Sequence, residues 1–159
     1  LETLADVGDP RGAAIAARAL DDDVFFVRAH ATRALAALGG IRDAGRIGRM
    51  LADRDWWVRF AARQALESLG AEASPSVIPF LVHPDLFARN GAAEVLQNTG
   101  VYARLLHEEA TGRTDRYRRD VLLLLAEAGG RRMWNGQMAR LAAVVHVRPT
   151  TGVSSPTAR

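Results

Sequence analysis

The chain has 159 residues, of which 48% are hydrophobic, 25% charged and 6% aromatic, the balance of a globular protein rather than of a disordered or fibrous one. It contains no cysteine, which excludes disulfides, thiolate metal sites and thiol nucleophiles, and no apolar run approaches the roughly 18 residues that span a bilayer. The net charge is +3, with all 21 basic residues arginine, and so small an excess indicates no particular partner.

Hydrophobic spacing predicts a series of helices in which shorter and longer ones alternate. In chain order they cover residues 11–20, 24–39, 43–51, 55–70, 75–82, 85–100, 101–110, 115–130 and 131–147. Residues 1–8 align with the closing half of a longer helix, so we expect a first unit that is cut and a protein that extends further upstream. Residues 148–159 are polar and carry prolines, which predicts a disordered tail.

An internal repeat of 30 or 31 residues organises these helices. Glycines, leucines and arginines recur at equivalent positions: Gly8, Gly39, Gly70, Gly100 and Gly130; Leu4, Leu35, Leu66 and Leu96; Arg28, Arg59, Arg89 and Arg119. Each unit is predicted to be a helical hairpin whose longer helix is capped by Asp55, Asp85 or Asp115. The same aspartate is expected to reach the recurring arginine of its unit; we call these residues the ladder arginines, and the recurring leucines the ladder leucines. Gly39 is expected to be a left-handed C-cap. Stacked hairpins must share one core, which predicts an all-α, right-handed α-solenoid.

The repeat frame points to a family. The segment DWWVRFAARQALESLG at residues 55–70, together with a Gly-Asp-Pro turn such as residues 8–10, resembles the short HEAT-like repeats of bilin lyases and of many bacterial proteins. The resemblance covers residues 1 to about 145 and implies a HEAT-like array over residues 1–147 in a bacterial protein. The matched residues are structural, so the resemblance implies a fold and no activity.

The side of the longer helices opposite the buried stripe is the predicted binding surface. We expect it to form a concave groove lined by Ala29, Arg33, Ala36, Phe60, Gln64, Glu67, Asn90, Glu94, Gln97, Asp120, Leu124 and Glu127. With Phe60 as its only aromatic residue and Arg33 as its main cation, such a groove disfavours nucleic acid and favours a protein or peptide partner. The residues predicted to bind the partner are Arg33, Phe60, Gln64, Asn90, Glu94 and Leu124. A solvated face without a partner is the alternative.

Leu124 is singled out within residues 121–126, where the repeat frame expects only Leu122, Leu125 and Ala126 to face the core. Leu124 lies about 200° from the centre of the stripe, so we expect it to be exposed in the groove. A helix or apolar peptide of a partner, or the missing upstream region, would then cover it.

Two other features look functional but are predicted to be structural. The ladder arginines sit at the edge of the core, where each pairs with a capping aspartate rather than with phosphate. Trp56 and Trp57 have counterparts in the other units, and this recurrence predicts packing between hairpins. An exposed aromatic platform, as in HEAT-like DNA glycosylases, is the alternative.

Catalytic and metal-binding patterns are absent from the sequence. The four histidines are scattered over different units, no His-Glu pairs recur in register, and no GxSxG, P-loop or GxGxxG motif occurs. We therefore predict no catalytic residue, no metal and no cofactor, and a non-enzymatic scaffold or adaptor in the cytoplasm. The alternatives are an enzyme similar to a bilin lyase or an alkyl-base DNA glycosylase, and an adaptor tethered to a membrane through a missing upstream region.

Overall fold

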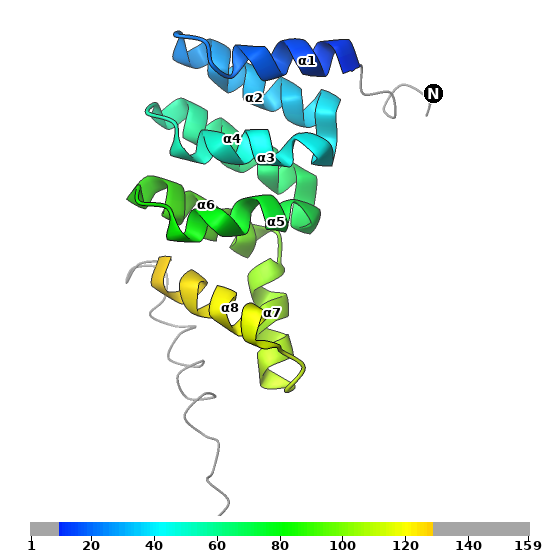
Figure 1. Ribbon diagram of the computed structural model, residues 1–159, viewed down its shortest axis with the longest axis vertical. Coiled ribbons are helices and arrows are strands. Elements are labelled where there is room, and N and C mark those ends of the chain that lie inside the picture. The colour runs from blue at the N-terminus through cyan, green and yellow to red at the C-terminus, as the bar shows by residue number, and fades with distance from the viewer. Residues whose placement is uncertain (1–9, 129–159) are drawn as a thin grey trace, which may run out of the picture.

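The computed structural model describes residues 10–128, and within this range the chain forms stacked helical hairpins without any strand. The hairpins are α1 (Pro10–Ala19) with α2 (Phe25–Gly39), α3 (Ala44–Arg49) with α4 (Trp56–Leu69), α5 (Ser74–Val77) with α6 (Leu86–Asn98), and α7 (Val101–Ala110) with α8 (Arg116–Ala128). Figure 1 shows the hairpins one below another, so that successive second helices are neighbours. The predicted all-α solenoid is confirmed.

The first helices of the two middle hairpins are short and irregular. Helix α3 lies between the 3₁₀ segments Gly40–Asp43 and Met50–Ala52, and α5 lies between Gly70–Ala73 and Ile78–Val82. Pro79 lacks a backbone N–H and cannot continue the α-helical hydrogen bonds of α5. At Gly48, a Cβ atom would meet the Ser76 carbonyl oxygen at 3.0 Å, so glycine permits the close approach of α3 and α5. The sequence therefore predicts the places of these helices but not their irregularity.

The core runs along the stack and is built from small and branched side chains. The ladder residues Leu35, Leu66 and Leu96 are all 0% exposed, as the repeat predicts. Ala61 and Ala62 of α4 are equally buried, and small residues at such contacts set how closely neighbouring helices approach. Ala29, which we expected in the groove, is also buried in this core.

Aspartates cap three of the second helices. The carboxylate of Asp55 accepts from the N–H of Trp57 at 2.8 Å, that of Asp85 from Phe87 at 2.7 Å, and that of Asp115 from Arg118 at 2.8 Å. These bonds satisfy N–H groups that have no partner within the helix. The three predicted caps are confirmed.

The predicted left-handed cap at Gly39 is wrong by one residue. Gly39 is helical, and the positive φ of 59° belongs to Gly40; in the next units it belongs to Gly70 and Gly100. A Cβ atom at Gly39 would clash with the carboxylate of Asp43, which explains the glycine there. Close packing thus requires glycine at position 39, and the positive φ favours glycine at position 40.

The last hairpin differs from the others in orientation. In Figure 1, α7 runs steeply across the direction of α1, α3 and α5, while α8 continues the stack. The half unit at residues 1–8, the helix at 131–147 and the tail at 148–159 lie outside the described residues, as do the expected limits of the array.

Candidate functional site

The ladder arginines close the turns that precede the second helices. Arg28, Arg59 and Arg89 each donate through Nη1 to the two carbonyls six and five residues earlier, at distances between 2.6 and 3.1 Å. The expected pairing with the capping carboxylates is wrong: within residues 10–128, no ion pair joins Arg59 to Asp55, Arg89 to Asp85 or Arg119 to Asp115. These carbonyls belong to the turn between the two helices of each hairpin, and the guanidinium satisfies them.

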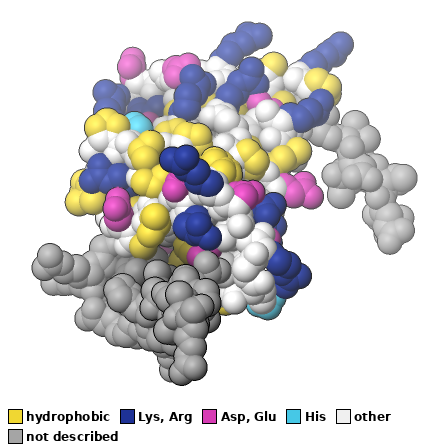
Figure 2. Space-filling view, turned by 60° about the horizontal axis from the view of Figure 1, so that its bottom comes forward, with side chains coloured by type: hydrophobic (Ala, Val, Ile, Leu, Met, Phe, Trp, Pro, Cys, Tyr) yellow, Lys and Arg dark blue, Asp and Glu magenta, His cyan; other side chains and the backbone are white. Residues whose placement is uncertain are grey.

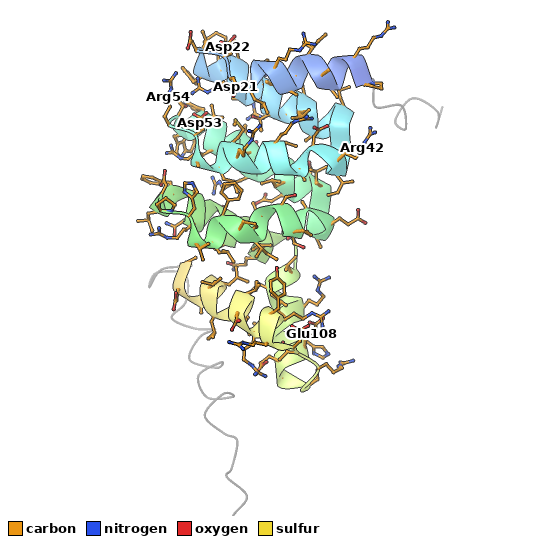
Figure 3. The ribbon with its side chains drawn as sticks, viewed as in Figure 1. Asp21, Asp22, Arg42, Asp53, Arg54 and Glu108 are labelled. Carbon is orange, nitrogen blue, oxygen red and sulfur yellow. The ribbon has the colours of Figure 1, made fainter. Side chains whose placement is uncertain are left out.

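Arg28 has an additional partner in the next unit. Its Nε and Nη2 donate to the two carboxylate oxygens of Asp53 at 2.8 and 2.9 Å, and Arg28 is only 5% exposed. Figure 3 shows Asp53 and Arg54 at the same end of the stack as Asp21 and Asp22 of the preceding turn. Burial alone would raise the pKa of Asp53, but the hydrogen bonds from Arg28 and from the backbone N–H of Asp55 hold it below its ordinary value. Arg28 is therefore structural.

Two hollows lie between successive second helices. The first, of about 140 Å³, lies between α2 and α4 and is lined by Phe25, Phe26, Ala29, His30, Arg33 and Trp57. The second, of about 130 Å³, lies between α4 and α6 and is lined by Leu51, Trp56, Arg59, Phe60, Arg63, Phe87, Asn90, Gly91 and Glu94. The hollows lie at successive junctions of second helices and share aromatic lining residues, but their cations differ: Arg33 lines the first, and Arg59 and Arg63 line the second.

Aromatic side chains connect these hollows. We call Phe25, Phe26, Trp56, Trp57, Phe60 and Phe87 the aromatic row. The rings of Trp56 and Trp57 are 4.6 Å apart, Phe60 stacks on Trp56 at 5.3 Å, and the Arg59 guanidinium lies 4.8 Å from the centre of the Phe87 ring. Hydrophobic side chains gather in Figure 2 on the side where the second helices begin.

All of the aromatic row except the half-buried Phe60 is exposed. Trp56 and Trp57 are 52% and 53% exposed, and Phe87 is 62% exposed. The predicted packing of the tryptophans between hairpins holds only in part: each borders a hollow between two second helices, but about half of its surface faces solvent, as in the alternative of an exposed aromatic platform. Both lie in the first turn of α4.

Comparison with known proteins identifies the repeat. The family model described as HEAT repeats matches residues 1–67. The chain is a HEAT-like repeat protein. No curated protein matches its sequence.

The HEAT-like repeat brings most of the predicted site residues to the two hollows. Arg33 lines the first hollow, and its Nη2 lies 3.4 Å from Oε1 of Gln64. Phe60, Asn90 and Glu94 line the second. Glu94 is paired with Arg63 across the hollow, so part of this face also joins neighbouring hairpins.

Leu124 departs from the prediction. It is half-buried and packs against the core, while Leu123 is the exposed leucine of α8, at 58%. The buried face of α8 includes Val121 as well as Leu122 and Leu125, and Leu124 lies on its flank, three residues after Val121. An apolar side chain at that position folds onto the core.

Sequence reasoning missed Trp56, Trp57, Arg59 and Arg63 as lining residues of the hollows in this HEAT-like protein. The available signal was the pair of large apolar residues directly after each turn. Such a pair sits at the very start of a helix, before the buried stripe is established, and can face solvent.

The described part of this HEAT-like protein offers no group of three or more acidic or histidine side chains that could hold a metal ion. None of the helices within residues 10–128 has both the length and the apolar character needed to cross a membrane. What the face does offer is aromatic surface, guanidinium groups and side-chain amides, which suit non-covalent binding.

Proposed function

We propose that this HEAT-like protein is a non-enzymatic scaffold or adaptor, cytoplasmic in location, that binds a protein or peptide across its second helices. The observation that carries the proposal is the exposed aromatic row. Solvation alone gives no reason to place large apolar side chains in one row through successive units, and such patches mark interaction sites. Arg33, Phe60, Gln64, Asn90 and Glu94 form the polar and aromatic surroundings of the row.

The arginines on this face favour a protein over a nucleic acid. A nucleic-acid groove needs cations free to track phosphates. Arg63 is paired with Glu94 and the ladder residue Arg28 with Asp53, so two of the cations along this face already have carboxylate partners. The aromatic row nevertheless resembles a stacking platform for bases, so single-stranded nucleic acid is the second candidate, and the experiment must distinguish the two.

Site-specific photocrosslinking in the cells that produce the protein tests the proposal. A photoreactive amino acid placed at exposed Gln64 should give discrete protein adducts, because this position borders the first hollow. The same group at exposed Arg49, on the first helix α3, is the matched control and should give none. Equal adducts at both positions, or adducts that nuclease removes, would contradict the proposal.

A further inference from the structure

The spacing of the hollows restricts the shape of a ligand. Adjacent packed helices lie roughly 8–10 Å apart, so the hollows between α2 and α4 and between α4 and α6 repeat at about that distance. An extended polyproline-type chain rises about 3.1 Å per residue and returns to the same face every three residues, or about 9.3 Å. One side chain in every three would therefore meet successive hollows.

The aromatic row restricts the chemistry of those side chains. Each hollow has an aromatic wall: Phe25, Phe26 and Trp57 in the first, and Trp56, Phe60 and Phe87 in the second. Grooves lined by aromatic rings bind apolar and proline-rich segments in other recognition domains. The side chains that enter the hollows should therefore be apolar.

The charges beside the row are positive and only partly balanced. Arg33 has the amide oxygen of Gln64 as its hydrogen-bond partner, and Arg59 has two carbonyl oxygens. Within residues 10–128, neither guanidinium is paired with a carboxylate. Each hollow thus combines an aromatic wall with a guanidinium group that can donate hydrogen bonds to a carboxylate of a ligand.

The turns beyond the row carry the opposite charge. Asp21, Asp22 and Asp23 precede α2, and the first two are seen at the turn end of the hairpin in Figure 3. Asp55 and Asp85 stand at the same end of α4 and α6, and the exposed Arg54 beside Asp55 offsets only part of their charge. This acidic edge repels carboxylates, so a ligand that carries them is directed over the hollows.

We propose that the partner presents an extended acidic peptide with an apolar side chain at every third residue, bound across α2, α4 and α6 along the aromatic row. This inference rests on the proposed function and adds the chemistry of the partner. The apolar residues enter the hollows, and the carboxylates between them contact Arg33 and Arg59.

Calorimetric titration of the full chain with synthetic probes tests the inference. The main probe is a peptide of about twelve residues made of leucine–proline–glutamate triplets, in which proline keeps the preceding leucine extended. Its controls are the same peptide with lysine in place of glutamate, an isomer with all leucines adjacent, and an oligothymidylate. The triplet peptide should bind at least about tenfold more tightly than each control, a difference of about 1.4 kcal/mol.

Two charge-reversal variants locate the binding. Arg33→Glu should weaken the acidic peptide about tenfold and improve the lysine peptide, because it reverses the charge at the first hollow. Arg49→Glu makes the same change on exposed α3 and should leave both affinities unchanged. Circular dichroism of both variants confirms that the helices are intact.

The outcomes separate this inference from the proposed function. Binding of none of the peptides, equal binding of the adjacent-leucine isomer, or preference for the lysine peptide would each overturn the acidic triplet ligand. Photocrosslinks at Gln64 would still support a protein partner in any of these cases. Tightest binding of the oligothymidylate would overturn the inference and favour single-stranded nucleic acid instead.

Discussion

The junction between α2 and α4 and the junction between α4 and α6 use the same ladder arginine in different ways. At the first, Arg28 binds both turn carbonyls and the carboxylate of Asp53, and it is buried. At the second, Arg59 binds the equivalent carbonyls, lies against the Phe87 ring and lines a hollow. Arg28 is therefore fully occupied by contacts within the fold, whereas Arg59 can also contact a ligand.

The difference comes from one position of the next turn. The residue that reaches back to the ladder arginine is Asp53 at the first junction; its equivalents are His83 and Arg113 in the following turns. Both Asp53 and His83 also accept the backbone N–H two residues later, at 2.8 and 3.1 Å, so the turn geometry is the same. A single side chain therefore decides whether a junction is locked by an ion pair.

The largest effect is expected for Asp53→Ala. It leaves the guanidinium of Arg28 buried without a carboxylate, and breaking a buried pair costs about 3–5 kcal/mol of unfolding free energy. Asp55→Ala, which removes only a cap, is the control and should cost about 1 kcal/mol. Urea denaturation of both variants measures the difference. Equal losses would show that the Arg28 pair contributes nothing beyond a capping bond.

Arg59→Ala should have an intermediate effect. It removes the donor to two carbonyls and the contact with Phe87, but it strands no carboxylate, so we expect a loss of roughly 1–2 kcal/mol. Thermal unfolding followed by circular dichroism, beside Arg28→Ala, checks the order. A smaller loss for Arg28→Ala than for Arg59→Ala would remove the contrast between the junctions.

His83→Asp should make the second junction resemble the first. The new carboxylate can accept the N–H of Asp85 as His83 does and can also pair with Arg59. We expect a gain of about 0.5–1 kcal/mol, because the pair is less buried than that of Arg28. The same variant should bind the acidic triplet peptide less tightly. Unchanged affinity would mean that Arg59 does not contact the ligand.

The smallest effect concerns pH. Because the pKa of Asp53 is lowered in the folded state, the unfolded chain takes up the proton first as the pH falls. The stability from the Arg28 pair is therefore complete above about pH 4 and is lost below it, as the pH passes through the folded pKa. Asp53→Asn should show a shallower loss of stability below about pH 4, measured by denaturant titration. An identical acid slope would assign the loss to other carboxylates.

Most of the fold was predictable because its signals are local and repeated. The buried leucines Leu35, Leu66 and Leu96 and the caps Asp55 and Asp85 occupy the positions that the period assigns. The period could not show which partner each arginine finds, because that partner comes from a neighbouring turn whose residues vary. The exposure of Trp56 and the half-burial of Leu124 likewise depend on what the neighbouring elements cover, which the repeat period does not give.

The candidate site was predicted in part. Arg33, Phe60, Asn90 and Glu94 follow from helical phase alone, and the structure brings them to the hollows. The aromatic pairs were read as packing residues because recurrence at the repeat period was taken as a sign of burial. In a solenoid, equivalent positions of successive repeats have similar surroundings, and these positions can all be exposed as well as all be buried.

The ladder arginines make different contacts in successive hairpins, so we expect the stiffness of the stack to vary along its length. From α2 to α8 the ladder arginine first holds a buried carboxylate, then only carbonyls, and finally, as Arg119, the side chain of Glu109 at 3.2 Å on an exposed surface. In a stack where each hairpin contacts only its neighbours, bending and fraying concentrate where the connection is weakest. Within residues 10–128, the stack should therefore be more rigid near α2 than near α8, and amide hydrogen exchange should be faster in α8 than in α2.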